Sequence, residues 1–260
     1  MAGALAARAT FCQPCGAPAV ARGSEMPDYG RRMRRNGKAR VAAKRIWGGL
    51  AVAAALAGGG LAAAPRGFEA QVLGELNALR ADPPGYSRSI AATRARFDGM
   101  ILRGRNRGEI DIRTSEGVAA VDEAVAALRA ATPVPTLEAG PVLTRAAADL
   151  VAEQSRSGGL GHRENGRGPA QRVVARGGGP YVGEVITYGH ADPASVIEQL
   201  VVGDGVPGRG HRTSVLRPDY RYAGVGCGAH PVHRRMCVIL LSPTADGTRP
   251  PPPVRPAAKR

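Results

Sequence analysis

Residues 183–226 read GEVITYGHADPASVIEQLVVGDGVPGRGHRTSVLRPDYRYAGVG and contain most of the polar side chains that look placed for chemistry. The stretch begins with Glu184, which lies between a glycine and the apolar run 185–188, and it carries His211 in a Gly-His-Arg triplet. A second Gly-His-Arg triplet upstream contains His162. These two histidines and one acid stand out in a chain that is otherwise rich in Ala, Arg and Gly.

Hydrophobic periodicity predicts helices before and within this stretch and short strands around it. Asp192-Pro193 is a typical helix start, with Asp192 as the N-cap. Helices separated by a few antiparallel strands indicate an α+β domain. The expected helices lie at 68–80, 116–131, 141–157 and 193–202, the strands at 184–188, 222–227 and 236–242, and the connections at 98–114 and 165–180.

Composition limits the chain to one sizeable core. It has 260 residues, of which 43% are hydrophobic, so two full domains are not expected. The net charge of +15 lies mostly in the ends: residues 1–65 hold 10 basic and 2 acidic side chains, whereas residues 66–245 hold 22 and 18. Without a basic face in the core, nucleic acid is not expected as a partner.

The N-terminal region predicts export. Residues 33–64 combine a basic segment, the apolar run IWGGLAVAAALAGGGLAAA and small residues, which is typical of a signal peptide cleaved near Ala64. The alternative is an uncleaved membrane anchor, but three glycines interrupt the run and it is short for a span. Residues 1–32 would then precede the true start. The protein is expected to be periplasmic or secreted.

The expected folded domain is residues 65–245, followed by a disordered, Pro-rich basic tail at 246–260. Cys227 and Cys237 flank a predicted hairpin and are a candidate disulfide in an oxidising compartment. Two buried free thiols are the alternative.

Several short motifs occur in order and resemble one family. They are LGHR at 160–163, GEVITYG at 183–189, DGVPGRGHRTSVLRPDY at 204–220 and AGVGCG at 223–228, with LNALRADPPGYS in the first helix and CVILLSP at the end. Together they resemble the CAP superfamily of cysteine-rich secretory, venom-allergen and plant pathogenesis-related proteins, in its bacterial branch.

The resemblance implies a three-layer α-β-α sandwich, with a small antiparallel sheet between helices. It also implies an open cleft of two histidines and two acids that can hold a divalent metal. His162 and His211 match the two histidines and Glu184 matches the first acid. The tryptophan that usually precedes the second acid is replaced by Leu200, and Asp204 is the candidate for that acid.

Imidazoles and carboxylates are suitable ligands for zinc, and carboxylates for calcium. A metal-bound water, or the same groups acting as general acid and base, would make a hydrolase acting on peptide or cell-wall material. The alternative is that the histidine and acid pairs are structural hydrogen bonds. Arg163 and Arg212 follow the two histidines and are candidate contacts for an anionic ligand, although Arg212 could pair with Asp219.

The expected function is a non-enzymatic module that binds an envelope or extracellular ligand, such as a lipid or a cell-wall polymer. The metal-assisted hydrolase is the alternative. Covalent catalysis is not expected, because the chain has no Gly-x-Ser-x-Gly motif. Contact with a membrane is expected only through the signal segment, if it stays uncleaved.

Overall fold

The computed structural model describes residues 67–106 and 109–252. The predicted signal peptide, the segment before it and the last residues of the tail lie outside these ranges.

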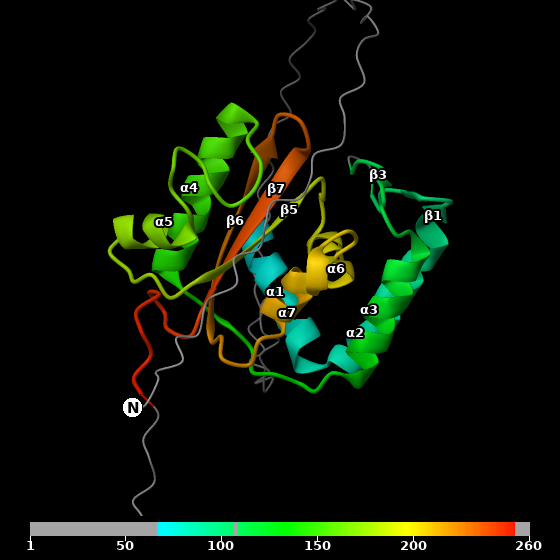
Figure 1. The fold of residues 1–260 in the computed structure, drawn as a ribbon, viewed down its shortest axis with the longest axis horizontal. Coiled ribbons are helices and arrows are strands. Elements are labelled where there is room, and N and C mark those ends of the chain that lie inside the picture. Colours follow the sequence, from blue (N-terminus) through cyan, green and yellow to red (C-terminus); the bar gives the residue numbers. More distant parts are fainter. Residues whose placement is uncertain (1–66, 107–108, 253–260) are drawn as a thin grey trace, which may run out of the picture. The chain divides into compact units, whose positions relative to one another are not determined.

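Four strands form the main sheet, in the order β4-β6-β7-β5 (Figure 1). β4 pairs with β6 in parallel, and the other neighbours are antiparallel. The strands are β4 (Glu138–Ala139), β5 (Gly183–Tyr188), β6 (Tyr222–His230) and β7 (Arg234–Ser242).

Helices cover both faces of this sheet (Figure 1). Because side chains alternate along a strand, Val185 and Ile239 pack with α1 and α6, whereas Ile186 and Val238 pack with α4 and α5. Two cores therefore lie on opposite sides of the sheet, as expected for an α-β-α sandwich. The helices are α1 (Phe68–Ala81), α2 (Pro83–Ala92), α3 (Val118–Ala130), α4 (Pro141–Ser157), α5 (Pro169–Ala175), α6 (Pro193–Val202) and α7 (Gly210–Val215).

Glycines on β6 allow α4 to lie directly on the strand. A Cβ atom at Gly224 would lie 2.1 Å from the backbone carbon of Leu143, and one at Gly226 would lie 2.8 Å from the backbone nitrogen of Ala148. Both distances are shorter than packed atoms allow, so any larger residue would push the helix away from the sheet.

A buried arginine in α1 binds the backbone of segments that are distant from it in sequence. The Arg80 side chain is fully buried and donates only to backbone carbonyls, and burial together with the charge of Arg221 lowers its pKa to about 10. Its guanidinium thus stays charged at neutral pH and joins segments that are distant in sequence. The acceptors are the carbonyl oxygens of Pro135, Val215, Arg217 and Tyr220.

Several short elements were not predicted. The prolines after α1 end that helix, as expected, but they also begin α2, whose N-cap Asp82 accepts a hydrogen bond from the backbone N–H of Gly85 at 2.8 Å. The expected connection at 165–180 contains α5, and His211 lies in α7, a helix that was not predicted. Two single-turn 3₁₀ helices, Thr93–Arg96 and Pro207–Arg209, complete the helical elements described.

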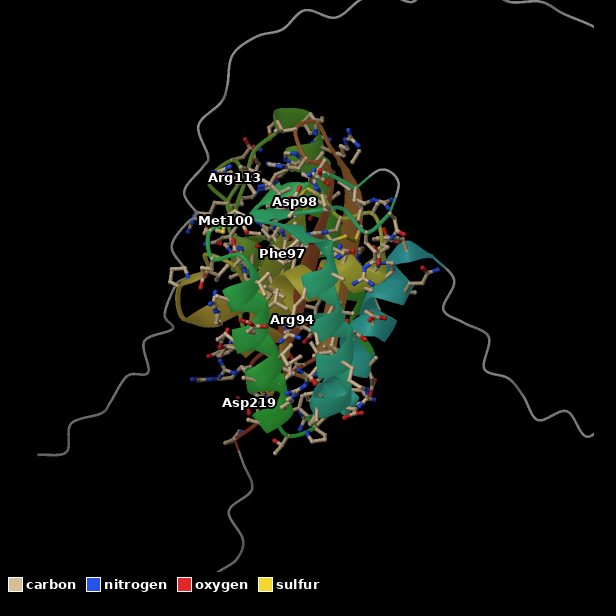
Figure 2. The ribbon with its side chains drawn as sticks, turned by 90° about the vertical axis from the view of Figure 1, so that its right-hand side faces the viewer. Arg94, Phe97, Asp98, Met100, Arg113 and Asp219 are labelled. Atoms are coloured by element: carbon tan, nitrogen blue, oxygen red, sulfur yellow. A yellow bond between two sulfur atoms is a disulfide. The ribbon has the colours of Figure 1, made fainter. Side chains whose placement is uncertain are left out.

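The expected connection at 98–114 is also partly ordered into a small antiparallel sheet (Figure 2). Ion pairs from Arg103 to Asp98 and Asp111 cross this sheet. Its strands are β1 (Phe97–Asp98), β2 (Ile101–Leu102) and β3 (Ile112–Arg113).

The hairpin of β6 and β7 carries the predicted disulfide. Cys227 and Cys237 are direct cross-strand partners, and their sulfur atoms are bonded. The strands run further than expected, to His230 and from Arg234, so the turn between them is short. The Cys227–Cys237 prediction is confirmed.

The chain keeps contact with the domain beyond residue 245, where the tail was expected to begin. Gly179 donates to the carbonyl of Asp246, and Tyr181 donates to that of Gly247. In the described part of the chain, no helix has both the length and the apolar character needed to cross a membrane.

Candidate functional site

His162 lies in the loop that follows α4, and a small hydrogen-bond network fixes this loop. Gly158 ends α4 in the left-handed conformation, with φ of 70°. The side chain of Gln154 donates to the carbonyl of Gly161 at 2.9 Å, and the Tyr188 hydroxyl accepts from the Gly161 N–H at 2.9 Å and donates to Gln154 at 2.9 Å. The residue before His162 is therefore tied to both α4 and β5.

Glu184 orients the His162 ring from the start of β5. Its Oε1 lies 3.0 Å from His162 Nδ1, and its side chain is only 1% exposed, whereas that of His162 is 31% exposed. A carboxylate can only accept a hydrogen bond, so Nδ1 carries the proton in this pair. The other ring nitrogen, Nε2, is left as an acceptor on a partly exposed side chain.

Arg172 in α5 binds the other oxygen of Glu184. Its Nη2 forms an ion pair with Oε2, and its Nη1 donates to the carbonyls of His162 at 3.0 Å and Arg167 at 3.3 Å. The Arg172 side chain is 0% exposed. One buried guanidinium thus holds both the carboxylate and the backbone of the histidine that the carboxylate orients.

His211, at the start of α7, is the second imidazole of the site. Burial, and secondarily the charge of His162, lower the pKa of His211 to about 4. The His162 charge thus acts on His211, which stays neutral at pH 7 because its pKa is lowered. We refer to His162, Glu184, Arg172 and His211 together as the histidine site.

Asp204 does not belong to this site, which corrects the prediction made for it. Its two carboxylate oxygens accept hydrogen bonds from the backbone N–H groups of Ser115 and Glu116, each at 2.7 Å. Asp204 anchors the segment before α3 to the loop after α6. The family pattern was a poor guide at this position, because its tryptophan is replaced by Leu200 and the left-handed Gly203 and Gly205 turn the chain on both sides of Asp204.

The two candidate anion contacts differ in the structure. Arg163 is exposed and donates to the carbonyl of Gly166 at 2.9 Å. Arg212 is buried, where it donates to the carbonyl of Val201 at 3.1 Å and pairs with Glu123. Arg212 therefore has an internal role, and its partner is not Asp219.

The donor set does not fit a divalent metal. Zinc sites in enzymes use three protein ligands, and structural zinc sites use four. In the histidine site both oxygens of Glu184 and Nδ1 of His162 are already engaged, which leaves two imidazoles. Across the residues that the structure describes, no group of three or more His, Cys, Asp or Glu side chains is arranged to hold a metal ion.

A third histidine supports the loop from the opposite side. His230 is buried, its Nε2 donates to the carbonyl of Gly159 at 3.0 Å, and its Nδ1 accepts from the backbone N–H groups of Val232 and His233. His230 thus links the β6–β7 turn to the loop that carries His162.

Arg172 is the functional residue that sequence reasoning missed. It occurs in a stretch with several other arginines, and nothing in its neighbours distinguishes it. The signal that would have found it is the helix start Gly168-Pro169, since α5 then places Arg172 and Val173 on its buried side.

The fold is an α-β-α sandwich in which a histidine from the loop after α4 pairs with a carboxylate at the second residue of β5. Residues 123–240 match the family model described as CAP, the cysteine-rich secretory protein family. Over this part of its length the chain is therefore similar to the family that its sequence motifs resemble. Assignment to a bacterial branch stays a prediction.

Among solved structures, an outer surface protein from Borrelia burgdorferi is similar to this chain. The two share 16% sequence identity with a TM-score of 0.36, and the match covers 42% of this chain and 78% of the other. At this TM-score the likeness carries no argument about this chain. No curated protein sequence matches the chain.

Proposed function

We propose that this chain is an exported, non-enzymatic binding module that recognises an envelope or extracellular ligand at the histidine site. The observation that carries the proposal is that His162 is held in a fixed orientation and is still partly exposed to solvent. Glu184 binds the His162 ring and Arg172 binds Glu184, yet the His162 side chain remains 31% exposed. A prearranged polar group at the surface, with the exposed Arg163 next to it in sequence, suits recognition of a polar ligand.

Export is part of the proposal. The Cys227–Cys237 disulfide supports an oxidising compartment, periplasmic or extracellular, because disulfides are rare in the cytosol. The secretory character of the family and the signal-like residues 33–64 agree with it. A lipid head group and a cell-wall polymer are the two ligand sources that suit this location.

The test is a binding measurement with defined probes. Full-length protein is mixed with vesicles of phosphatidylglycerol and phosphatidylethanolamine, and separately with purified peptidoglycan, and the bound fraction is measured by sedimentation. We expect one probe to bind and His162→Gln to weaken that binding at least tenfold. Arg94→Gln, an exposed residue paired with Asp122 in another part of the domain, should leave it unchanged. Absence of binding to both probes would contradict the proposal.

One observation favours a second function. A histidine whose Nδ1 is held by a buried carboxylate has the arrangement of a general base, with Nε2 as the accepting atom. Such a site could activate water against a peptide or cell-wall bond without a metal. Release of soluble fragments from peptidoglycan or from a peptide mixture, abolished by His162→Gln, would establish hydrolysis and replace the binding proposal.

A further inference from the structure

Arg172 and Glu184 form a buried ion pair in the centre of the histidine site. Their side chains are 0% and 1% exposed. Taking two charges out of water is unfavourable unless they are paired and hydrogen-bonded, so a buried pair of this kind has to be held by its surroundings. Here Arg172 also binds the carbonyls of His162 and Arg167, although its Nε has no hydrogen-bond partner among the described residues.

The Arg172 guanidinium supplies the positive charge that balances the buried Glu184 carboxylate. Without Arg172, Glu184 would be a buried carboxylate with no cationic partner, still bonded to His162, whose charge in turn acts on the second imidazole, His211. Carboxylates and imidazoles are the ligand chemistry that zinc prefers. With Arg172 present, the carboxylate is already neutralised on its Oε2 side, and a divalent cation would meet a fixed like charge. Glu184 therefore cannot pair at full strength with the Arg172 guanidinium and a divalent metal ion at the same time.

We propose that Arg172 is a built-in cation that takes the place of a divalent metal, so that the histidine site works without one. Arg172 is a positioning residue: it holds Glu184, and Glu184 holds the His162 ring. The part of this inference that concerns metal exclusion by Arg172 is independent of the proposed function. The part that concerns ligand recognition without a metal rests on the proposed function. Loss of the guanidinium should free Oε2 of Glu184 and let the carboxylate and the imidazoles rearrange around a metal ion.

The test is calorimetric titration of Zn²⁺ into the full chain. Cys12→Ser and Cys15→Ser are included in every variant, because two thiols at this spacing can bind zinc themselves. The series comprises the parent, Arg172→Met, Arg172→Lys and Arg176→Met. Arg176 makes an exposed ion pair with Asp149 and is the matched control for loss of an arginine near α5.

We expect the parent and Arg176→Met to show no Zn²⁺ binding that depends on His162. Arg172→Met should gain at least tenfold in Zn²⁺ affinity, and His162→Ala should remove that gain. Arg172→Lys keeps a positive charge and should behave like the parent. Zn²⁺ binding by the parent that His162→Ala removes would overturn the inference, as would a folded Arg172→Met variant with no gain.

If circular dichroism shows that Arg172→Met is unfolded, Arg172→Gln replaces it, and the parent titration still decides whether the site takes metal. Ligand binding in the presence of EDTA separates this inference from the proposed function. A parent that excludes Zn²⁺ but binds neither vesicles nor peptidoglycan contradicts the proposed function only. Ligand binding that EDTA abolishes contradicts the inference only.

Discussion

Nδ1 of His162 lies 3.0 Å from Oε1 of Glu184, and the two residues come from different elements of the fold. Glu184 is placed by the pairing of β5 with β7, where it lies opposite Leu240. His162 is placed by the loop after α4, which Tyr188 holds through its hydroxyl. The contact therefore depends on both the sheet register and one loop, and it is the geometric basis of the functional proposals.

The Glu184→Gln variant should be strongly destabilised. The amide keeps the shape of the side chain but leaves the Arg172 guanidinium buried without a counter-ion, which in other proteins costs about 3–5 kcal/mol. Urea unfolding followed by circular dichroism measures the loss. Asp149→Asn removes the partner of the exposed Arg176 and should cost less than about 1 kcal/mol. Equal effects of the two changes would show that the Arg172–Glu184 pair is not buried in solution.

The stability of the domain should fall as the solution is acidified, through His211. Its pKa is about 4 in the folded protein against an ordinary value of 6.5, because burial and the charge of His162 disfavour protonation. Below the unfolded pKa the unfolded chain binds this proton first, so stability is full above about pH 6.5 and declines toward pH 4, by up to about 3 kcal/mol.

Free energies of unfolding at several pH values between 4 and 8 measure this decline. In His211→Gln the part of the decline that His211 causes should be absent. A parent and a variant with parallel pH profiles would show that His211 does not titrate with a lowered pKa.

Alanine at Gly224 should separate α4 from the sheet. The added Cβ would lie 2.1 Å from helix backbone, which cannot rotate away, so we expect a loss of at least about 2 kcal/mol. Gly228→Ala is the matched control on the same strand, because its Cβ would meet only a side-chain atom of Val151, at 2.5 Å, and should cost about 1 kcal/mol. Thermal unfolding of both variants measures which one loses more stability. A larger loss in Gly228→Ala than in Gly224→Ala would be inconsistent with the close approach of α4 to β6.

Removal of the disulfide should weaken the hairpin without unfolding the domain. The bond joins residues 10 apart in sequence, and closing a loop of this size is worth about 3 kcal/mol in the unfolded chain. Cys227→Ala with Cys237→Ala should lower the free energy of unfolding by about that amount, and dithiothreitol should do the same to the parent only. A parent that is insensitive to the reductant under unfolding conditions would argue against the bond.

The sequence could predict the parts of the fold that local chemistry determines. Pro141 and Gly158 mark the ends of α4, and Asp192 caps α6 by accepting from the N–H of Ser195 at 3.1 Å, as its position predicted. The continuous apolar run of β7 indicated a buried strand. Each of these signals lies within a few residues of the feature that it specifies.

Elements that depend on distant contacts could not be found in this way. The two-residue strands β1 to β3 have no periodicity to detect, and their pairing comes from the surrounding fold. The same holds for the histidine site. His162, Glu184 and His211 were identified from motifs, whereas Arg172 carried no motif and Asp204 was assigned where the family pattern is broken by the loss of its tryptophan. Only tertiary structure shows which charges face each other.

Long-range ¹H–¹⁵N correlation of the histidine side chains at pH 7.5 tests the central claim most directly, because it reports which ring nitrogen carries the proton. The His162–Glu184 contact predicts a proton on Nδ1 of His162 and none on Nε2, with the His162 signals assigned by their loss in His162→Gln. Glu184→Gln should remove this preference. A parent protein in which His162 carries its proton on Nε2 would contradict the account, since Glu184 would then not orient the ring.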